Sequence, residues 1–348
     1  FDRAAGVPRG EFTYASDQVG TGDYVFRQKN LVFPDMTVEA AIETVYPDVT
    51  LDYLAMLSDE AALLAVINEE ADFALSSVFG ASKGALYPVP PALRASPVAH
   101  DAIAVYVAFS YEQRSQGLPQ ALDGRLTFAQ LRQLYTGQIT NWRQLGGPDL
   151  PVLLYVPSEP DVVAVFEQRV LQDPLTIAAF RQLLDMQAET AVNDANLASI
   201  FDPMAESSVT PVRVLRTFDS LRAVIQDFEA SGIGSIGFGP LSQVFGQCSV
   251  YPLALKADTG AYVQSLIRTE DGAAIDPAID LCQDKGRYQR HDRAIITGQY
   301  PLAYPFEVIF PYDNSRPPIG RKVVDMLQAT DSQKRLEQAG LVPIEMAE

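Results

Sequence analysis

The chain contains few of the side chains on which metal centres depend. Its 348 residues include only two histidines and two cysteines. His100 and His291 are far apart in the sequence, and neither has a carboxylate or cysteine at the spacing of a zinc site. We therefore expect no metal and no cofactor. Long apolar runs are also missing, since no stretch of about 18 apolar residues is present to span a bilayer.

Positive charge is scarce. The chain has 26 lysines and arginines against 44 aspartates and glutamates, which gives a net charge of −18. Nucleic acids and anionic membranes attract basic surfaces, so both are excluded as expected partners, and a cationic ligand or partner is more compatible. The mixed-charge run Asp284–Arg293 is the most basic stretch, and we interpret it as a solvated surface.

Signatures of catalysis are also absent. His100 and Asp101 could belong to a Ser-His-Asp triad, but no G-x-S-x-G elbow supplies a nucleophile. The stretch Gly232–Gly237 matches the G-x-G-x-x-G dinucleotide fingerprint, which requires a strand before it and a helix after it. Here the pattern predicts a helix before it and a strand after it, so the glycines are interpreted as a helix stop. We expect a protein that is not an enzyme.

The two cysteines, Cys248 and Cys282, are either paired or simply buried, and we favour pairing. A disulfide across this loop would stabilise the fold by roughly 2–4 kcal/mol and would require an oxidising compartment. Segment 258–300 has a loop-like composition. It is predicted to be an excursion held back by the disulfide, with disorder as the alternative.

The length and the 47% hydrophobic content allow a substantial core, in two domains or one large unit. Short apolar runs alternate with helical patterns, which indicates βαβ units and a mainly parallel sheet. Val49–Leu54 and Phe73–Leu75 are predicted strands. Ala102–Phe109 is a continuous apolar run of the kind that is buried on both faces of a sheet.

The stretch Leu126–Gly147 combines a helix, a stop and an apolar anchor. Thr127 and Gln130 form a capping-box pattern, and the residues that follow recur along one helical face. Gly137 stands where a left-handed residue ends a helix, and Trp142, the only tryptophan, follows as an anchor. The stretch predicts a compact structural module.

This stretch resembles the G-x-I-x-x-W-x-x-L-G-G segment of the phosphate-type solute-binding proteins that serve ABC importers. Other parts of that family pattern follow in the right order: ADFALSS at 71–77, VAHDAIAVYV at 98–107, SGIGSIGF at 231–238 and QAGLVPI near the end. The start, GVPRGEFTY at 6–14, is similar to cyanobacterial versions. The resemblance implies a type II periplasmic binding protein fold, which is α/β with mixed sheets and two crossing strands between two lobes. We expect lobe 1 at 1–104 and 255–348, and lobe 2 at 105–254.

The resemblance also implies a role. We expect an extracytoplasmic solute-binding or sensing domain, a monomer that closes on a small-molecule ligand or oxyanion in a cleft between its lobes. A membrane transporter or a signalling protein would be its partner. The sequence starts at Phe1 without a signal peptide, so we expect that a signal or anchor was removed.

Members of that family hold an oxyanion with helix N-termini, hydroxyls, an arginine and an aspartate that accepts a proton from the ligand. Asp72 is the expected acceptor, because it stands in the ADFALSS motif. The loops after the predicted strands supply the other expected ligand-binding residues: Ser16, Asp17, Ser58, Ser76, Ser158 and Asp161.

Three of these loops depart from the family pattern. Asp17 stands where a hydroxyl is expected, Asp59 and Glu60 replace a glycine-rich loop, and the loop 156–161 has acids in place of an arginine. Two like charges about 4 Å apart repel by roughly 4 kcal/mol at a dielectric near 20, so we predict weak or absent binding of free phosphate. Arg94 or Arg143 could rebuild an anion site. The alternative function is a degenerate scaffold that acts as a protein-interaction or structural module.

Overall fold

The chain forms two compact units. The computed structural model describes residues 4–29, 31–113, 116–193, 211–313 and 316–344. Unit 1 contains Phe1–Ile103, Glu159–Val165 and Asp292–Glu348, and unit 2 contains Ala104–Ser158 and Phe166–His291. Residues 255–291, which we had placed with lobe 1, lie in unit 2.

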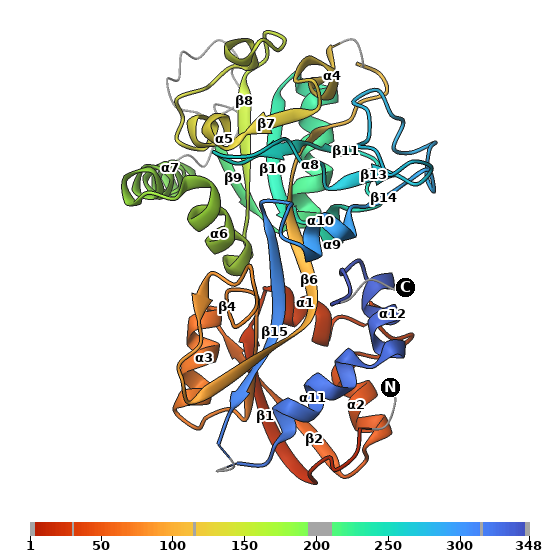
Figure 1. Cartoon of the computed structure of the whole chain (residues 1–348). Helices are drawn as coiled ribbons and strands as arrows, with labels where there is room; N and C mark the ends of the chain where they lie inside the picture. Colours follow the sequence, from red (N-terminus) through yellow and green to blue (C-terminus); the bar gives the residue numbers. More distant parts are fainter. Residues whose placement is uncertain (1–3, 30, 114–115, 194–210, 314–315, 345–348) are drawn as a thin grey trace. The chain divides into compact units, whose positions relative to one another are not determined.

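Unit 1 is built on a mixed sheet in the order β2-β1-β3-β15-β6 (Figure 1). β1 pairs in parallel with β2 and β3, whereas β15 is antiparallel to β3 and β6. The strands are β1 (Gly10–Asp17), β2 (Val49–Met56), β3 (Phe73–Ser76), β6 (Leu93–Ala108) and β15 (Ala303–Pro311), with the short pair β4 (Phe79–Gly80) and β5 (Tyr87–Pro88). β6 begins in unit 1 and its last residues belong to unit 2.

Helices cover both faces of this sheet. The helices of unit 1 are α1 (Thr21–Arg27), α2 (Val38–Val45), α3 (Asp59–Ile67), α6 (Pro160–Phe166, of which the last residue belongs to unit 2), α10 (Asp292–Ile296), α11 (Ile319–Gln328) and α12 (Thr330–Gln338). Successive side chains of a strand point to opposite faces. Tyr14 accordingly packs in the cluster formed with α1, α2 and α11, while Ala15 packs against α3.

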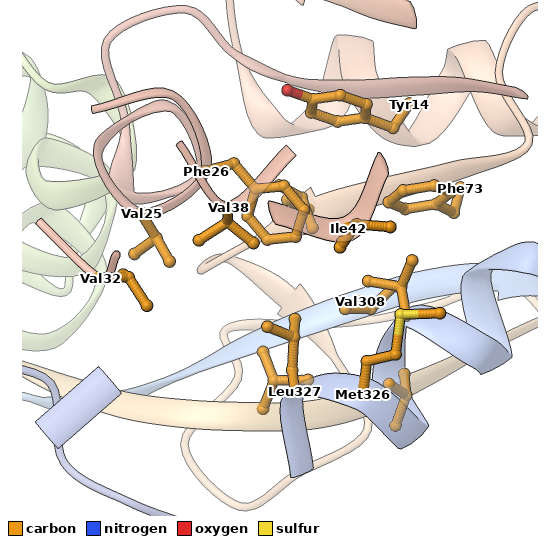
Figure 2. Packing of buried hydrophobic residues seen from close by; sticks show 14 of the residues in the cluster. Tyr14, Val25, Phe26, Val32, Val38, Ile42, Phe73, Val308, Met326 and Leu327 are labelled. Carbon is orange, nitrogen blue, oxygen red and sulfur yellow. The ribbon is translucent and has the colours of Figure 1, made fainter. Parts of the chain in front are cut away.

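The larger of these two clusters forms the core of unit 1. Figure 2 shows Tyr14 and Phe73 from the sheet beside Phe26 of α1 and Ile42 of α2, with Met326 of α11 below them. Tyr14 and Phe73 stack with their ring centroids 5.5 Å apart. Burying a side chain of this size contributes about 1.5–3 kcal/mol, so the cluster fixes the sheet against its helices.

Unit 2 contains the strands that follow β6 in the sheet order: β10 lies between β6 and β8, and β9 follows β8. β8 pairs in parallel with both β10 and β9. The strands are β7 (Arg125–Thr127), β8 (Val152–Pro157), β9 (Val212–Leu215), β10 (Gly234–Pro240), β11 (Val250–Pro252), β12 (Ala254–Lys256), β13 (Leu266–Arg268) and β14 (Tyr288–Arg290). The helices are α4 (Leu118–Ala121), α5 (Phe128–Tyr135), α7 (Pro174–Asn193), α8 (Thr217–Ser231) and α9 (Leu241–Val244), with a 3-10 turn at Trp142–Leu145 and a π-helical turn at Glu167–Leu171.

The module at 126–147 forms as the sequence predicts. Thr127 and Gln130 make both bonds of a capping box at the start of α5. Gly137 has a φ of +74°, the left-handed conformation expected after the helix. The indole of Trp142 is fully buried and donates from Nε1 to the carbonyl of Gly234, at 2.6 Å.

The glycines of the G-x-G-x-x-G stretch are structural. Gly232 ends α8 with a φ of +62°, and Gly234 begins β10. A Cβ on Gly234 would collide with the indole of Trp142, and a Cβ on Gly237 would lie 2.9 Å from the ring of Tyr106. These positions are glycine because aromatic rings pack directly on the backbone.

Cys248 and Cys282 form a disulfide, as predicted. The segment 258–300 has regular structure, because β13 and β14 pair as antiparallel strands and α10 follows them. β12 pairs with β7 of unit 2, and the disulfide joins Cys282 to Cys248 of the same unit. These links place residues 255–291 in unit 2.

Candidate functional site

The carboxyl ends of three parallel strands of unit 1 meet at one edge of its sheet. β1 pairs with β2 along its whole length and with β3 near its end. Ser16 and Asp17 end β1, Ser58 and Asp59 follow β2, and Ser76 ends β3 with Ser77 directly after it. Four of the predicted ligand-binding residues, Ser16, Asp17, Ser58 and Ser76, are therefore brought to this edge.

Asp59, which the sequence marked as a departure from the family pattern but not as a ligand-binding residue, contacts this group. Its Oδ2 accepts hydrogen bonds from Ser76 Oγ at 2.7 Å, Ser77 N at 2.8 Å and Val78 N at 3.0 Å. The residue is the first of α3, and Ser58 caps that helix by accepting a bond from Ala61 N at 3.2 Å. A negative group of the protein thus already occupies the donors at the end of β3.

The serine hydroxyls at this edge are used within the protein. Ser76 Oγ, besides donating to Asp59, accepts bonds from Val78 N at 3.1 Å and Phe79 N at 2.8 Å. Ser16 Oγ donates to the carbonyl of Asp17 at 3.3 Å. The hydroxyl of the buried Ser77 has no hydrogen-bond partner. The hydroxyls of Ser16 and Ser76 therefore stabilise the backbone at the ends of β1 and β3.

Asp161 occupies a second set of donors in unit 1. Its Oδ2 accepts bonds from Thr21 N at 3.0 Å and Thr21 Oγ1 at 2.8 Å, at the start of α1. Gly20 allows this approach, because a Cβ there would lie 3.2 Å from both Asp161 Cγ and Asp17 Cβ. The side chains of Asp17 and Asp161 therefore flank the same glycine.

Asp17 is satisfied on one oxygen only. Oδ1 accepts a bond from Val19 N at 3.0 Å, whereas Oδ2 is buried and has no partner. Only 1% of the side chain is exposed. The pKa of Asp17 is raised to about 6, mainly by burial; the bond from Val19 lowers it, and the negative charge of Asp161 contributes to the rise.

Burial also raises the pKa of Asp59, to about 7, and the charge of Asp161 is the next cause. The hydrogen bonds from Ser76 and Ser77 lower the pKa of Asp59, because they favour its ionised form. Both acids thus have a proton affinity that reaches the neutral pH range. Both carboxyl groups are buried, and their neighbours are backbone N–H groups, hydroxyl groups and other carboxylates.

Two predicted residues do not join this group. Asp72 precedes β3 and accepts a bond from Thr13 N at 2.8 Å, in the middle of β1. Four residues of extended strand, about 13 Å, separate it from Ser76. Its expected role as the acceptor for the ligand does not fit this position. Ser158 lies in unit 2, where its N–H donates to the carbonyl of Leu215.

The two arginines that could have rebuilt an anion site are engaged elsewhere. The guanidinium of Arg94 lies 3.6 Å from the centre of the Tyr312 ring. Arg143 is in unit 2 and pairs with Asp149 at 3.4 Å. Within the described ranges, no three carboxylates, histidines or cysteines are arranged to hold a metal ion. No helix in the same ranges combines the length and apolar character that a membrane crossing requires.

A family model described as the PBP superfamily domain matches residues 32–209 of the chain. The chain belongs to this superfamily. Its resemblance to phosphate-type periplasmic binding proteins is thereby confirmed, and so is the two-lobed mixed α/β fold. No curated protein matches this chain significantly in sequence.

Solved structures of PBP proteins share the fold at low sequence identity. A putative phosphate ABC transporter substrate-binding protein of Clostridium perfringens, solved with bound phosphate, has a TM-score of 0.55 at 15% identity, over 97% of this chain and 100% of its own. An ABC-type phosphate transport receptor of Vibrio cholerae has 0.56 at 16%, over 95% and 99%. A possible phosphate-binding protein of Planctomyces limnophilus has 0.55 at 12%, over 97% and 94%.

Proposed function

We propose that this PBP protein is an extracytoplasmic solute-binding or sensing domain, without catalytic activity, and that free phosphate is not its ligand. The fold supports the solute-binding role, because the family and the similar solved structures are binding proteins. The carboxylates at the sheet edge support the exclusion of phosphate.

The position of Asp59 carries this proposal. Its Oδ2 accepts hydrogen bonds from the Ser76 hydroxyl and from the next two backbone N–H groups. An incoming dianion would have to displace this carboxylate and then remain beside it. At an effective dielectric near 20, like charges about 4 Å apart repel by roughly 4 kcal/mol, and half of that amount already weakens binding more than tenfold.

The expected partners follow from the family. The C. perfringens and V. cholerae proteins are described as parts of phosphate ABC transport. By analogy, this chain would deliver or report a small solute to a transporter or signalling protein outside the cytoplasm, as a monomer.

Titration calorimetry tests the exclusion of phosphate. We expect no heat from phosphate or sulfate with the wild-type protein at about pH 7.5. The Asp59→Ser variant removes the internal carboxylate and frees the Ser77 and Val78 N–H groups, so its affinity for phosphate should be at least about tenfold higher. Micromolar binding of phosphate by the wild-type protein would overturn the proposal.

Asp72→Ala provides the matched control. It removes a carboxylate of the same unit that lies away from the three strand ends, so it should not change the response to phosphate. A screen for solutes that raise the melting temperature completes the test, because a ligand that binds the folded state stabilises it. A chain that no solute stabilises would favour the degenerate-scaffold alternative instead.

A further inference from the structure

A seven-residue segment, Glu159–Val165, belongs to unit 1, although the residues on both sides of it belong to unit 2. It includes most of α6. Asp161 anchors the segment through the two bonds from Thr21 to its Oδ2. The contact joins residues 140 positions apart in the chain. The contact between Thr21 and Asp161 is therefore a tertiary contact, which forms only in the folded chain.

The anchor lies among acids. Asp17 flanks the same glycine as Asp161 and has one buried oxygen without a partner. The charge of Asp161 acts on both Asp17 and Asp59. Buried charges in proteins are normally paired, and an unpaired buried carboxylate is strongly destabilising. A proton on Asp17 removes that charge and allows Oδ2 to act as a donor.

We propose that protons bound to Asp17 and Asp59 keep the segment Glu159–Val165 anchored to α1, and that loss of these protons releases Asp161 from Thr21. The segment therefore acts as a proton-controlled latch. The inference rests on the same three carboxylates as the proposed function, and it adds a regulation that the exclusion of phosphate does not require.

Among the residues that the structure describes, the charged groups that act on Asp17 and Asp59 are themselves carboxylates. Asp23 of α1 adds to the repulsion at Asp17, and Tyr53 of β2 feels the charge of Asp17. The pKa of the buried Tyr304 of β15 is raised mainly by burial and also by the negative charges of Asp101, Asp161 and Glu159, and Glu159 belongs to the latch segment. The nearby cation Arg27 is committed to pairs with Asp23 at 3.3 Å and Glu39 at 3.5 Å.

The proton affinities give the direction of the switch. The pKa values of Asp17 and Asp59 rise to about 6 and about 7 in the folded chain, above the ordinary value of 3.8. An acid whose pKa is raised in the folded chain stabilises the folded arrangement at low pH, and this stabilisation is lost as the pH rises from about 4 through the folded pKa. Release of the latch should therefore occur between about pH 6 and about pH 8.

Amide hydrogen exchange at Thr21 reports the latch directly, because its N–H donates to Asp161. Expressed as a protection factor, which removes the intrinsic dependence on pH, the protection of the wild-type chain should fall at least about tenfold between about pH 5.5 and about pH 8.5. The Asp17→Asn, Asp59→Asn double variant keeps an amide oxygen as hydrogen-bond acceptor at both positions and removes both titrating carboxyl groups. Its protection should change less than about threefold over the same range.

Two further variants define the readout. Asp161→Ala should show low protection at Thr21 at every pH, which establishes that the amide reports the contact. Asp72→Asn, outside the cluster, should behave like the wild-type chain. The proposal is overturned if wild-type protection is independent of pH, or if the Asp17→Asn, Asp59→Asn double variant loses protection as the wild-type chain does. Phosphate titration is a separate measurement, so a failure of the proposed function would be recognised independently.

Discussion

At the scale of single residues, buried carboxylates of unit 1 act as internal anions for backbone N–H groups. Asp59 accepts from Ser77 and Val78. Glu307 does the same on the neighbouring loop, where its two oxygens accept from Ala81 N at 3.1 Å and Ser82 N at 2.9 Å. Such bonds are stronger than those between neutral groups and hold loops in place.

Asp17 differs from these acids, because one of its oxygens is buried without a partner. Replacing it with asparagine should stabilise the protein by about 1–3 kcal/mol at about pH 8, the cost of an unsatisfied buried polar group. The gain should vanish below about pH 4, where the acid is protonated in both the folded and unfolded states. Melting temperatures of Asp17→Asn and the wild-type chain across this range provide the test. Equal melting temperatures at about pH 8 would contradict it.

The sequence predicts some of these residues and misses others for a definable reason. Asp17 and Ser76 end strands whose apolar runs are visible, so their edge of the sheet could be inferred. Asp72 stands before its strand, and ligands of open α/β sheets lie at the carboxyl ends of strands. That rule could have excluded it. Asp59 resembles any acid in the first turn of a helix, and only contacts across 17 to 19 positions reveal its role.

At the scale of elements, the module around Trp142 fixes α8, β10 and the 3-10 turn against one another. The indole packs on Gly234, and its Nε1 bonds to the carbonyl of the same residue. Caps such as that of Thr127 and Gln130 are encoded within four residues, so they were predictable. The Trp142–Gly234 contact spans 92 positions and was not.

Gly234→Ala should destabilise unit 2, because the added methyl group would collide with the ring of Trp142. Overpacking of a close-packed core costs about 1–3 kcal/mol. The single tryptophan makes the measurement specific, since thermal unfolding followed by its fluorescence reports this unit. Gly246→Ala is a comparison of a different kind, because its φ of +85° strains a side chain although no atom lies within 4 Å of the added Cβ. A Gly234→Ala variant that melts at the wild-type temperature would contradict the predicted clash with the ring.

At the scale of the whole molecule, each unit has its own means of stabilisation. Unit 1 has the large core of Figure 2, whereas the disulfide belongs to unit 2. The unit boundaries were only partly predictable. The passage near residue 104 lies within the long apolar strand β6, whereas the return at Asp292 follows the short pair β13–β14 and the disulfide, whose partners are distant in sequence.

Reduction of the disulfide should lower the stability of unit 2 by about 2–4 kcal/mol, because it frees a loop of 34 residues in the unfolded chain. The melting midpoint from Trp142 fluorescence should fall when a thiol reductant is added. A Cys248→Ser, Cys282→Ser double variant should melt at the reduced midpoint and ignore the reductant. A midpoint that the reductant leaves unchanged in the wild-type chain would contradict this assignment.

The strand order of unit 1 also bears on how the chain is made. β15 lies between β3 and β6, yet it is the last strand in the sequence. During synthesis from the amino end, the partners of β15 are therefore made long before the strand that separates them. Unit 2 has all its residues once His291 has been added, whereas the sheet of unit 1 must wait for Pro311. On the ribosome, the second unit in the sequence can thus finish folding before the first.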